Sequence, residues 1–223
     1  EGRRKATVAD LLTRLSRVLF PEDCCCPVCD RELLLRPDGL CAQCAAAVRR
    51  CDAPSFFAPL DGLAVSFWYD PVLHDAMHRF KYQGQTYLAR FFMRELTLPA
   101  DWSIDRVVPV PMHPLKEYLR GYNPPDALAI ALRERCPSLQ VDRSLLKKTR
   151  LTRSQTQKTA SERRNILETV YLASSKTAGL SVLLIDDVVT TRSTLMACAD
   201  ALKKQGAVRV YAACACSAVP PKF

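Results

Sequence analysis

Apolar and polar positions follow two periods along this chain of 223 residues. Short runs of β-branched and aliphatic residues, typical of buried strands, alternate with segments whose apolar residues recur at helical spacing. The pattern predicts strands over residues 64–69, 104–111, 182–185 and 208–215, and helices starting at Pro71 and spanning residues 126–135 and 193–205. Such alternation favours an α/β fold with a doubly wound, mostly parallel sheet flanked by helices.

Two prolines mark a boundary after a cysteine-rich N-terminal region. Pro54 and Pro59 interrupt the hydrophobic pattern between Asp52 and Leu60. A chain of this length can form one domain or two unequal ones. We therefore expect a small helix and a four-cysteine metal-binding module over residues 1–55, and the α/β domain over residues 60–223.

The hydropathy pattern contains no membrane-spanning segment. No apolar run approaches the roughly 18 residues that are needed to cross a bilayer. The helix-like stretch over residues 8–20 is interrupted by Arg14 and Arg17, which argues against a signal peptide. We expect a cytoplasmic protein that reaches the inner face of the membrane only through partners.

Four of the eleven cysteines have the spacing of a structural zinc site. They form two CxxC pairs, Cys26 with Cys29 and Cys41 with Cys44. Four thiolates fill the tetrahedral shell of Zn²⁺ and leave no open position, so the predicted site is structural and not catalytic. The register is open at one position, because Cys24 or Cys25 could replace Cys26, and loss of the metal could leave a disulfide.

Residues 182–194, VLLIDDVVTTRST, are the most informative segment: an apolar strand, two acids, and a hydroxyl-rich turn that opens into a helix. Ligands of parallel α/β sheets bind beyond the carboxyl ends of the strands, where Asp186 and Asp187 are expected. Adjacent carboxylates can hydrogen-bond a vicinal diol such as the 2- and 3-hydroxyls of ribose. The neighbouring hydroxyls belong to Thr190, Thr191, Ser193 and Thr194. Together with the N–H groups of a helix start, these hydroxyls favour the binding of a phosphate. The alternative interpretation of the segment is a buried strand followed by an ordinary capped helix.

This segment resembles the phosphoribosyl diphosphate (PRPP) loop of type I phosphoribosyltransferases, in which the acids hold ribose and the turn holds the 5-phosphate. Arg192 stands where members of that family usually have Gly. A turn that needs a positive φ would be strained at this residue by roughly 1 to 3 kcal/mol. Alternatively, Arg192 adds a cation to the phosphate site.

Three further segments resemble the ComF family, whose members join a cysteine knuckle to a phosphoribosyltransferase-like domain. Residues 107–123, VVPVPMHPLKEYLRGYN, are similar to the family's RGFN segment. Residues 78–84, HRFKYQG, are similar to its LKF-type segment. Residues 148–165, KTRLTRSQTQKTASERRN, are similar to its T, Q, ER and N signature. The chain is identified as a member of this family over nearly its whole length. It departs from the family at Tyr122, where Phe is usual, at Pro124 and Pro125, and at Arg192.

The resemblance implies a type I phosphoribosyltransferase-like fold preceded by a small helix and a zinc ribbon. It also implies binding of PRPP, or a related phosphosugar, with Mg²⁺, and a role in DNA uptake during natural transformation. The site residues that it implies are Asp186 and Asp187 for ribose, Thr190, Thr191, Arg192, Ser193 and Thr194 for the 5-phosphate, and Arg120 and Gly121 near the pyrophosphate. In these enzymes a nucleophile displaces pyrophosphate from C1 of PRPP.

No motif identifies the acceptor or a general base, so it stays open whether the chain is a phosphoribosyltransferase or a sensor of its ligand. Arg120 is alternatively a surface cation or the partner of a helix end.

A net charge of +9 and one basic run introduce polyanions as a second class of ligand. The run covers residues 143–164 and includes Lys147, Lys148, Arg150 and Arg153. It could bind the backbone of single-stranded DNA, close over PRPP as a lid, or be a solvated basic loop. The alternative function is therefore a non-catalytic single-stranded DNA-binding or adaptor protein with a vestigial PRPP site. The zinc module could dock a DNA-uptake helicase or channel protein.

Overall fold

The computed structural model describes residues 25–51, 57–149 and 170–218. The chain divides between Ala47 and Val48 into two compact units. The helix-like stretch over residues 8–20, Cys24, and the basic residues Arg150 and Arg153 lie outside the described residues. Among the helices that the structure describes, none is long and apolar enough to cross a bilayer.

The first unit is organised by two cysteine-bearing turns. An antiparallel bridge joins Cys25 to Glu32, and within it the N–H of Asp30 donates to the carbonyl of Cys26 at 2.8 Å. Asp30 and Gly39 both have positive φ, 58° and 72°. The short helix α2 (Ala42–Ala47) follows the second turn. Each turn therefore brings its chain back on itself, which is the local geometry that a CxxC knuckle needs.

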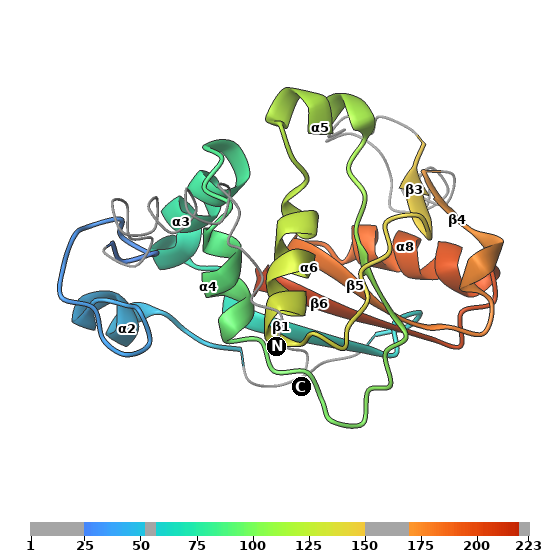
Figure 1. Cartoon of the computed structure of the whole chain (residues 1–223), viewed down its shortest axis with the longest axis horizontal. Coiled ribbons are helices and arrows are strands. Elements are labelled where there is room, and N and C mark those ends of the chain that lie inside the picture. The colour runs from blue at the N-terminus through green and yellow to red at the C-terminus, as the bar shows by residue number, and fades with distance from the viewer. Residues whose placement is uncertain (1–24, 52–56, 150–169, 219–223) are drawn as a thin grey trace, which may run out of the picture. The chain divides into compact units, whose positions relative to one another are not determined.

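The second unit is built on a four-stranded sheet in which every neighbouring pair of strands is parallel (Figure 1). Its strand order is β1 (Gly62–Trp68), β6 (Arg209–Ser217), β5 (Ser181–Val189) and β2 (Arg106–Pro109). The apolar run at residues 182–185 forms the first half of β5 and is fully buried. A parallel strand covered on both faces needs such a continuous run, and the predicted fold class is confirmed.

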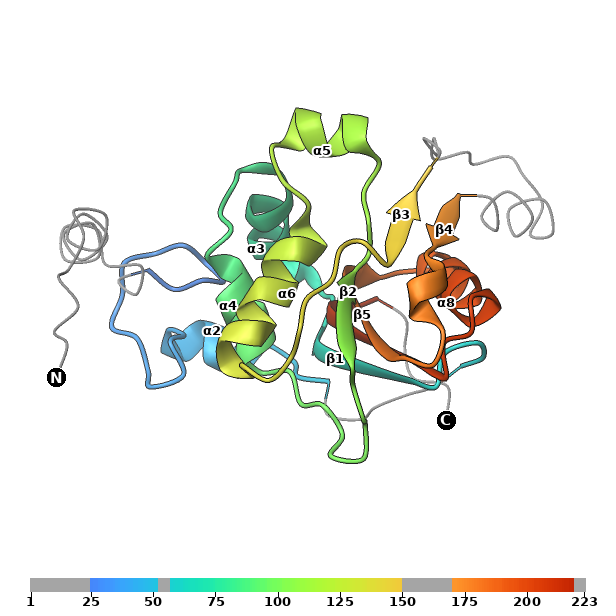
Figure 2. The same cartoon turned by 45° about the vertical axis from the view of Figure 1, so that its right-hand side comes forward.

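Helices cover both faces of the sheet (Figure 2). The helices of this unit are, in chain order, α3 (Pro71–Tyr82), α4 (Leu88–Arg94), α5 (Pro114–Arg120), α6 (Pro124–Arg135) and α8 (Ser193–Lys204). Helix α3 begins where predicted, because the Asp70 side chain accepts from the N–H of Val72 and Pro71 occupies the first turn. Its apolar residues Leu73 and Phe80 are fully buried. Helices α4 and α6 lie on one side of the sheet and α8 on the other.

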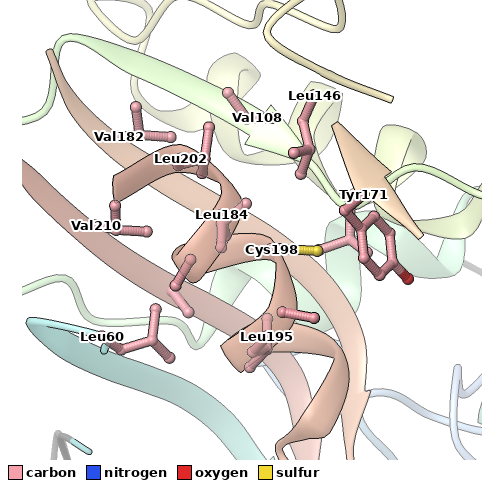
Figure 3. Close-up of a cluster of buried hydrophobic side chains, with 14 of the residues drawn as sticks. Leu60, Val108, Leu146, Tyr171, Val182, Leu184, Leu195, Cys198, Leu202 and Val210 are labelled. Atoms are coloured by element: carbon pink, nitrogen blue, oxygen red, sulfur yellow. The ribbon is translucent and has the colours of Figure 1, made fainter. Parts of the chain in front are cut away.

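The core between α8 and the sheet positions the end of β5 (Figure 3). Leu184 of β5 and Val210 of β6 belong to the same buried cluster as Leu195 and Cys198 of α8. The cluster continues into an antiparallel hairpin of β3 (Leu146–Lys148) and β4 (Tyr171–Ala173), followed by the 3₁₀ turn η1 (Ser175–Thr177). The hydrophobic pattern did not predict this hairpin, which lies on the α8 side of the sheet.

The prediction was also too short for β5, which extends four residues beyond Ile185, to Val189. Asp186 and Asp187 are therefore part of the strand instead of following it. Pairing with β6 explains the extension, since the register continues from Asp186 opposite Cys214 to Val189 opposite Ser217.

Candidate functional site

The two acids of β5 lie where the neighbouring strands part. Pairing between β2 and β5 ends at Pro109 opposite Ile185, whereas β5 stays paired with β6 as far as Val189. The N–H of Val110 still donates to the carbonyl of Ile185 at 2.8 Å, and the chain then turns away toward α5. Ligands of open α/β sheets bind in the crevice at the carboxyl end of such diverging strands.

Asp187 faces a cation from α3. The Lys81 ammonium is 3.0 Å from Oδ1 of Asp187, and both side chains are mostly buried. The charge of Asp187 also contributes to raising the pKa values of Tyr69 and Tyr122, after burial, which is the main cause. This carboxylate therefore belongs to the side of the strand that faces α3 and the residues after α5.

Asp186 has different neighbours, because consecutive side chains of a strand point to opposite faces. Its charge acts on Tyr171 of the hairpin and on Cys198 of α8, whose pKa values are raised chiefly by burial. Its Oδ1 accepts the backbone N–H of Asp187 at 2.9 Å. Burial and the charge of Asp187 raise the pKa of Asp186 to about 7. A carboxyl group whose pKa is raised can donate to a sugar hydroxyl when it is protonated and accept from one when it is ionised.

The turn after β5 adopts a left-handed backbone conformation at Arg192. Arg192 has φ 62° and ψ −11°, in the left-handed region where glycine is favoured. The hydroxyls of Thr191 and Ser193 are 2.7 Å apart, and the first residue of α8 is Ser193. No side-chain capping bond closes this helix start. The first N–H groups of α8 lack partners within the helix, as at any helix start.

The Arg192 side chain stacks on an aromatic ring. Its guanidinium carbon is 4.6 Å from the centre of the Phe57 ring. Within the described residues its Nε is buried without a hydrogen-bond partner. The positive φ and the stacking together show how an arginine is accommodated at a position where related loops have glycine.

The structure brings Arg120 and Gly121 to the α3 side of the crevice. Gly121 ends α5 with φ 86°, and its N–H donates to the carbonyl of Glu117 at 2.8 Å. The Arg120 guanidinium lies 4.7 Å from the centre of the Tyr82 ring. Tyr82 follows Lys81 in the sequence. Sequence reasoning singled out Arg120 but not Lys81, although the HRFKYQG segment contains it.

The two described lysines of the basic run lie on β3. Lys147 is exposed and pairs with Leu172 of β4, whereas Lys148 is partly buried and pairs with Tyr171. The structure therefore separates two lysines that the sequence placed in one group.

The first unit brings together the thiols that the spacing predicted. The Sγ atoms of Cys26, Cys29, Cys41 and Cys44 all lie within 4.8 Å of one another. Cys25 is described but is not a member of this group. Backbone N–H groups point at two of the sulfurs, from Cys41 to Sγ of Cys26 at 3.5 Å and from Cys44 to Sγ of Cys41 at 3.4 Å.

The electrostatics of this cluster suit a metal. The hydrogen bond from the Cys44 N–H is the main cause that lowers the pKa of Cys41 to about 7, whereas burial raises the pKa of Cys44. A soft divalent cation binds all four sulfurs as thiolates, and so it stabilises the ionised form of Cys44 as well as that of Cys41. The four-cysteine cluster could hold a metal such as Zn²⁺, for which a sulfur-only tetrahedral set is a typical structural site.

Comparison with known proteins defines the class. A family model described as a phosphoribosyl transferase domain matches residues 120–220. Among solved structures, glutamine PRPP amidotransferase from B. subtilis, complexed with ADP and GMP, aligns with a TM-score of 0.41 and 17% identity over 62% of this chain and 30% of that one. A structure described as the allosteric regulatory enzyme of purine biosynthesis gives 0.40 and 15% over the same shares. The family model and the parallel sheet define the larger unit as a phosphoribosyltransferase-like domain.

Relatives of similar length carry the assignment further. DNA utilization protein YhgH of Escherichia coli K12 is 27% identical, over 86% of this chain and 96% of the relative. YhgH of Salmonella typhimurium is 28% identical over the same shares. Competence protein F of Haemophilus influenzae is 26% identical over 81% of this chain and 91% of the relative. These relatives and the family model support the assignment of the chain to the ComF family, with a phosphoribosyltransferase-like domain.

Proposed function

We propose that this protein binds PRPP with Mg²⁺ at the carboxyl end of β5 and acts in DNA uptake during natural transformation. The observation that carries the proposal is the acid pair of β5 followed at once by the left-handed turn at Arg192 and the start of α8. The names of the relatives, which refer to DNA utilization and to competence, support the cellular role.

In this proposal each part of the site has a separate task. Asp186 and Asp187 hold the ribose hydroxyls, and the N–H groups and hydroxyls from Thr190 to Thr194 hold the 5-phosphate. Lys81 neutralises Asp187 at 3.0 Å and keeps two adjacent acids compatible with the folded state. Magnesium, when bound with the diphosphate, supplies charge neutralisation for the leaving group.

The same proposal includes a structural Zn²⁺ in the first unit. Its ligands are Cys26, Cys29, Cys41 and Cys44, whose sulfurs already converge. Since that set has no place for a substrate, the metal acts on folding and not on the sugar chemistry.

Calorimetric titration with PRPP and Mg²⁺ tests the sugar-phosphate site. The wild type should bind saturably, and the double variant Asp186→Asn, Asp187→Asn should not. Asparagine resembles the protonated acid in shape, so the variant should fold. Asp75→Asn is the matched control, because Asp75 on α3 has 85% of its side chain exposed and no part in the site.

The outcomes separate the candidate functions. If the wild type does not bind PRPP, the site is vestigial and the alternative holds, a single-stranded DNA-binding or adaptor protein. If PRPP binds but the double variant supports transformation at the wild-type frequency in a naturally competent host, the sugar site is not linked to DNA uptake.

A further inference from the structure

Lys148 occupies an unusual place for a lysine of a basic run. It is the last residue of β3 and pairs with Tyr171, which is 3% exposed and belongs to the core cluster beside Cys198 (Figure 3). The Lys148 ammonium lies 5.1 Å from the centre of the Tyr171 ring. Lys147 precedes it on the opposite face of the strand and is exposed.

The ammonium of Lys148 lacks an acidic partner in the described part of the chain, where no carboxylate lies within 4.0 Å of it. Burial lowers the pKa of Lys148, and the positive charge of Lys116 on α5 lowers it further, while the charge of Asp186 acts in the opposite direction. Lys148 is thus a partly desolvated cation within electrostatic reach of the acid that is proposed to hold ribose.

The aromatic platform under Lys148 also connects to the phosphate loop. The Thr194 side chain, in the first turn of α8, acts on the Tyr171 hydroxyl as a hydrogen-bonding neighbour and opposes the rise of its pKa on burial. Lys148, Asp186 and Thr194 are therefore all neighbours of the Tyr171 side chain. A partly buried cation without a carboxylate partner is unfavourable until an anion approaches, and charge-assisted bonds to phosphate oxygens are among the strongest that lysine makes.

We infer that Lys148 contacts a phosphate group of the phosphosugar, whereas Lys147 does not. This inference rests on the proposed function, since it assigns one more contact of the same site. Under this inference, Lys148 does not belong to a nucleic-acid-binding surface formed by the basic run.

The test compares Lys148→Met with Lys147→Met, which remove the same charge from opposite faces of β3. Calorimetry with PRPP and Mg²⁺ should show that Lys148→Met weakens binding by about tenfold or more and Lys147→Met by less than about twofold. Lys148→Arg should restore most of the affinity, because it keeps the charge. Thermal unfolding of both methionine variants checks that the fold is kept.

Two smaller probes identify the phosphate that Lys148 contacts. A loss of affinity for ribose 5-phosphate alone assigns Lys148 to the 5-phosphate, and a loss for inorganic pyrophosphate with Mg²⁺ assigns it to the diphosphate. The inference is overturned if the wild type binds PRPP and Lys148→Met binds it equally well, or if both methionine variants weaken it alike. Failure of the wild type to bind PRPP overturns the proposed function itself and this inference with it.

Discussion

Replacing Arg192 by Gly and by Ala separates backbone strain from side-chain contacts. With φ 62° and ψ −11°, a side chain at this position raises the energy of the folded state by about 1 to 2 kcal/mol. Glycine relieves that strain but loses about 0.4 to 1 kcal/mol more chain entropy on folding. Both variants lose the contact with Phe57, so it cancels in their difference. We expect the free energy of unfolding of Arg192→Gly to exceed that of Arg192→Ala by about 0.5 to 1 kcal/mol.

Urea unfolding followed by tryptophan fluorescence measures this difference. The two tryptophans of the chain, Trp68 and Trp102, both lie in the larger unit, so the signal reports the part that contains the turn. If Arg192→Ala is as stable as Arg192→Gly or more so, the turn carries no strain and the reasoning fails. The affinity of Arg192→Gly for PRPP addresses the other role of this arginine: a loss of about tenfold or more would show that the guanidinium meets the phosphate.

Three further predictions concern the two acids of β5 and the cysteine cluster. Folding raises the pKa of Asp186 from 3.8 to about 7, so the wild type should lose stability as the pH rises from about 4 through 7. Urea unfolding at about pH 5 and pH 8 should show a smaller loss for Asp186→Asn. An equal loss in both proteins would contradict the raised pKa. Lys81→Met removes a cation that lowers the pKa of Asp186. Carboxyl ¹³C NMR should therefore show a higher pKa of Asp186 in this variant than in the wild type. An unchanged pKa would mean that the two groups are uncoupled. Cys41→Ser should reduce the zinc content measured by elemental analysis, whereas the control Cys25→Ser should retain it. Equal zinc contents in both variants would exclude the four-sulfur site.

The sequence was sufficient for the parts of the fold that have a strong local pattern. Residues 182–185 predicted a buried parallel strand because all four are apolar, and Pro71 predicted the start of α3. The resemblance to a glycine position gave a strained left-handed turn as one of two interpretations of Arg192, and the backbone has that conformation. In each case the information lies within a few neighbouring residues.

Other features depend on partners that are distant in the sequence. The pattern ended β5 at Ile185 because two acids follow, whereas pairing with Cys214 and Cys216 of β6 carries the strand onward. The hairpin of β3 and β4 has only three residues on each side, too few for a period to be read. Lys81 was missed because its partner lies on another element, and nothing in the spacing of α3 distinguishes it from a surface lysine.

The Lys81–Asp187 ion pair also has a consequence for folding kinetics. Its two residues are more than a hundred positions apart in the sequence, on α3 and β5, and the first and last strands of the sheet must pair before the site is complete. Closing so long a segment is slow, because the entropy of the intervening chain is lost before the contact is gained. A fragment that ends before β6 contains the site residues but lacks the strand that pairs with β5 along its whole length. During synthesis, the strand that carries Asp186 and Asp187 therefore gains this neighbour only after Ser217 has been added to the chain.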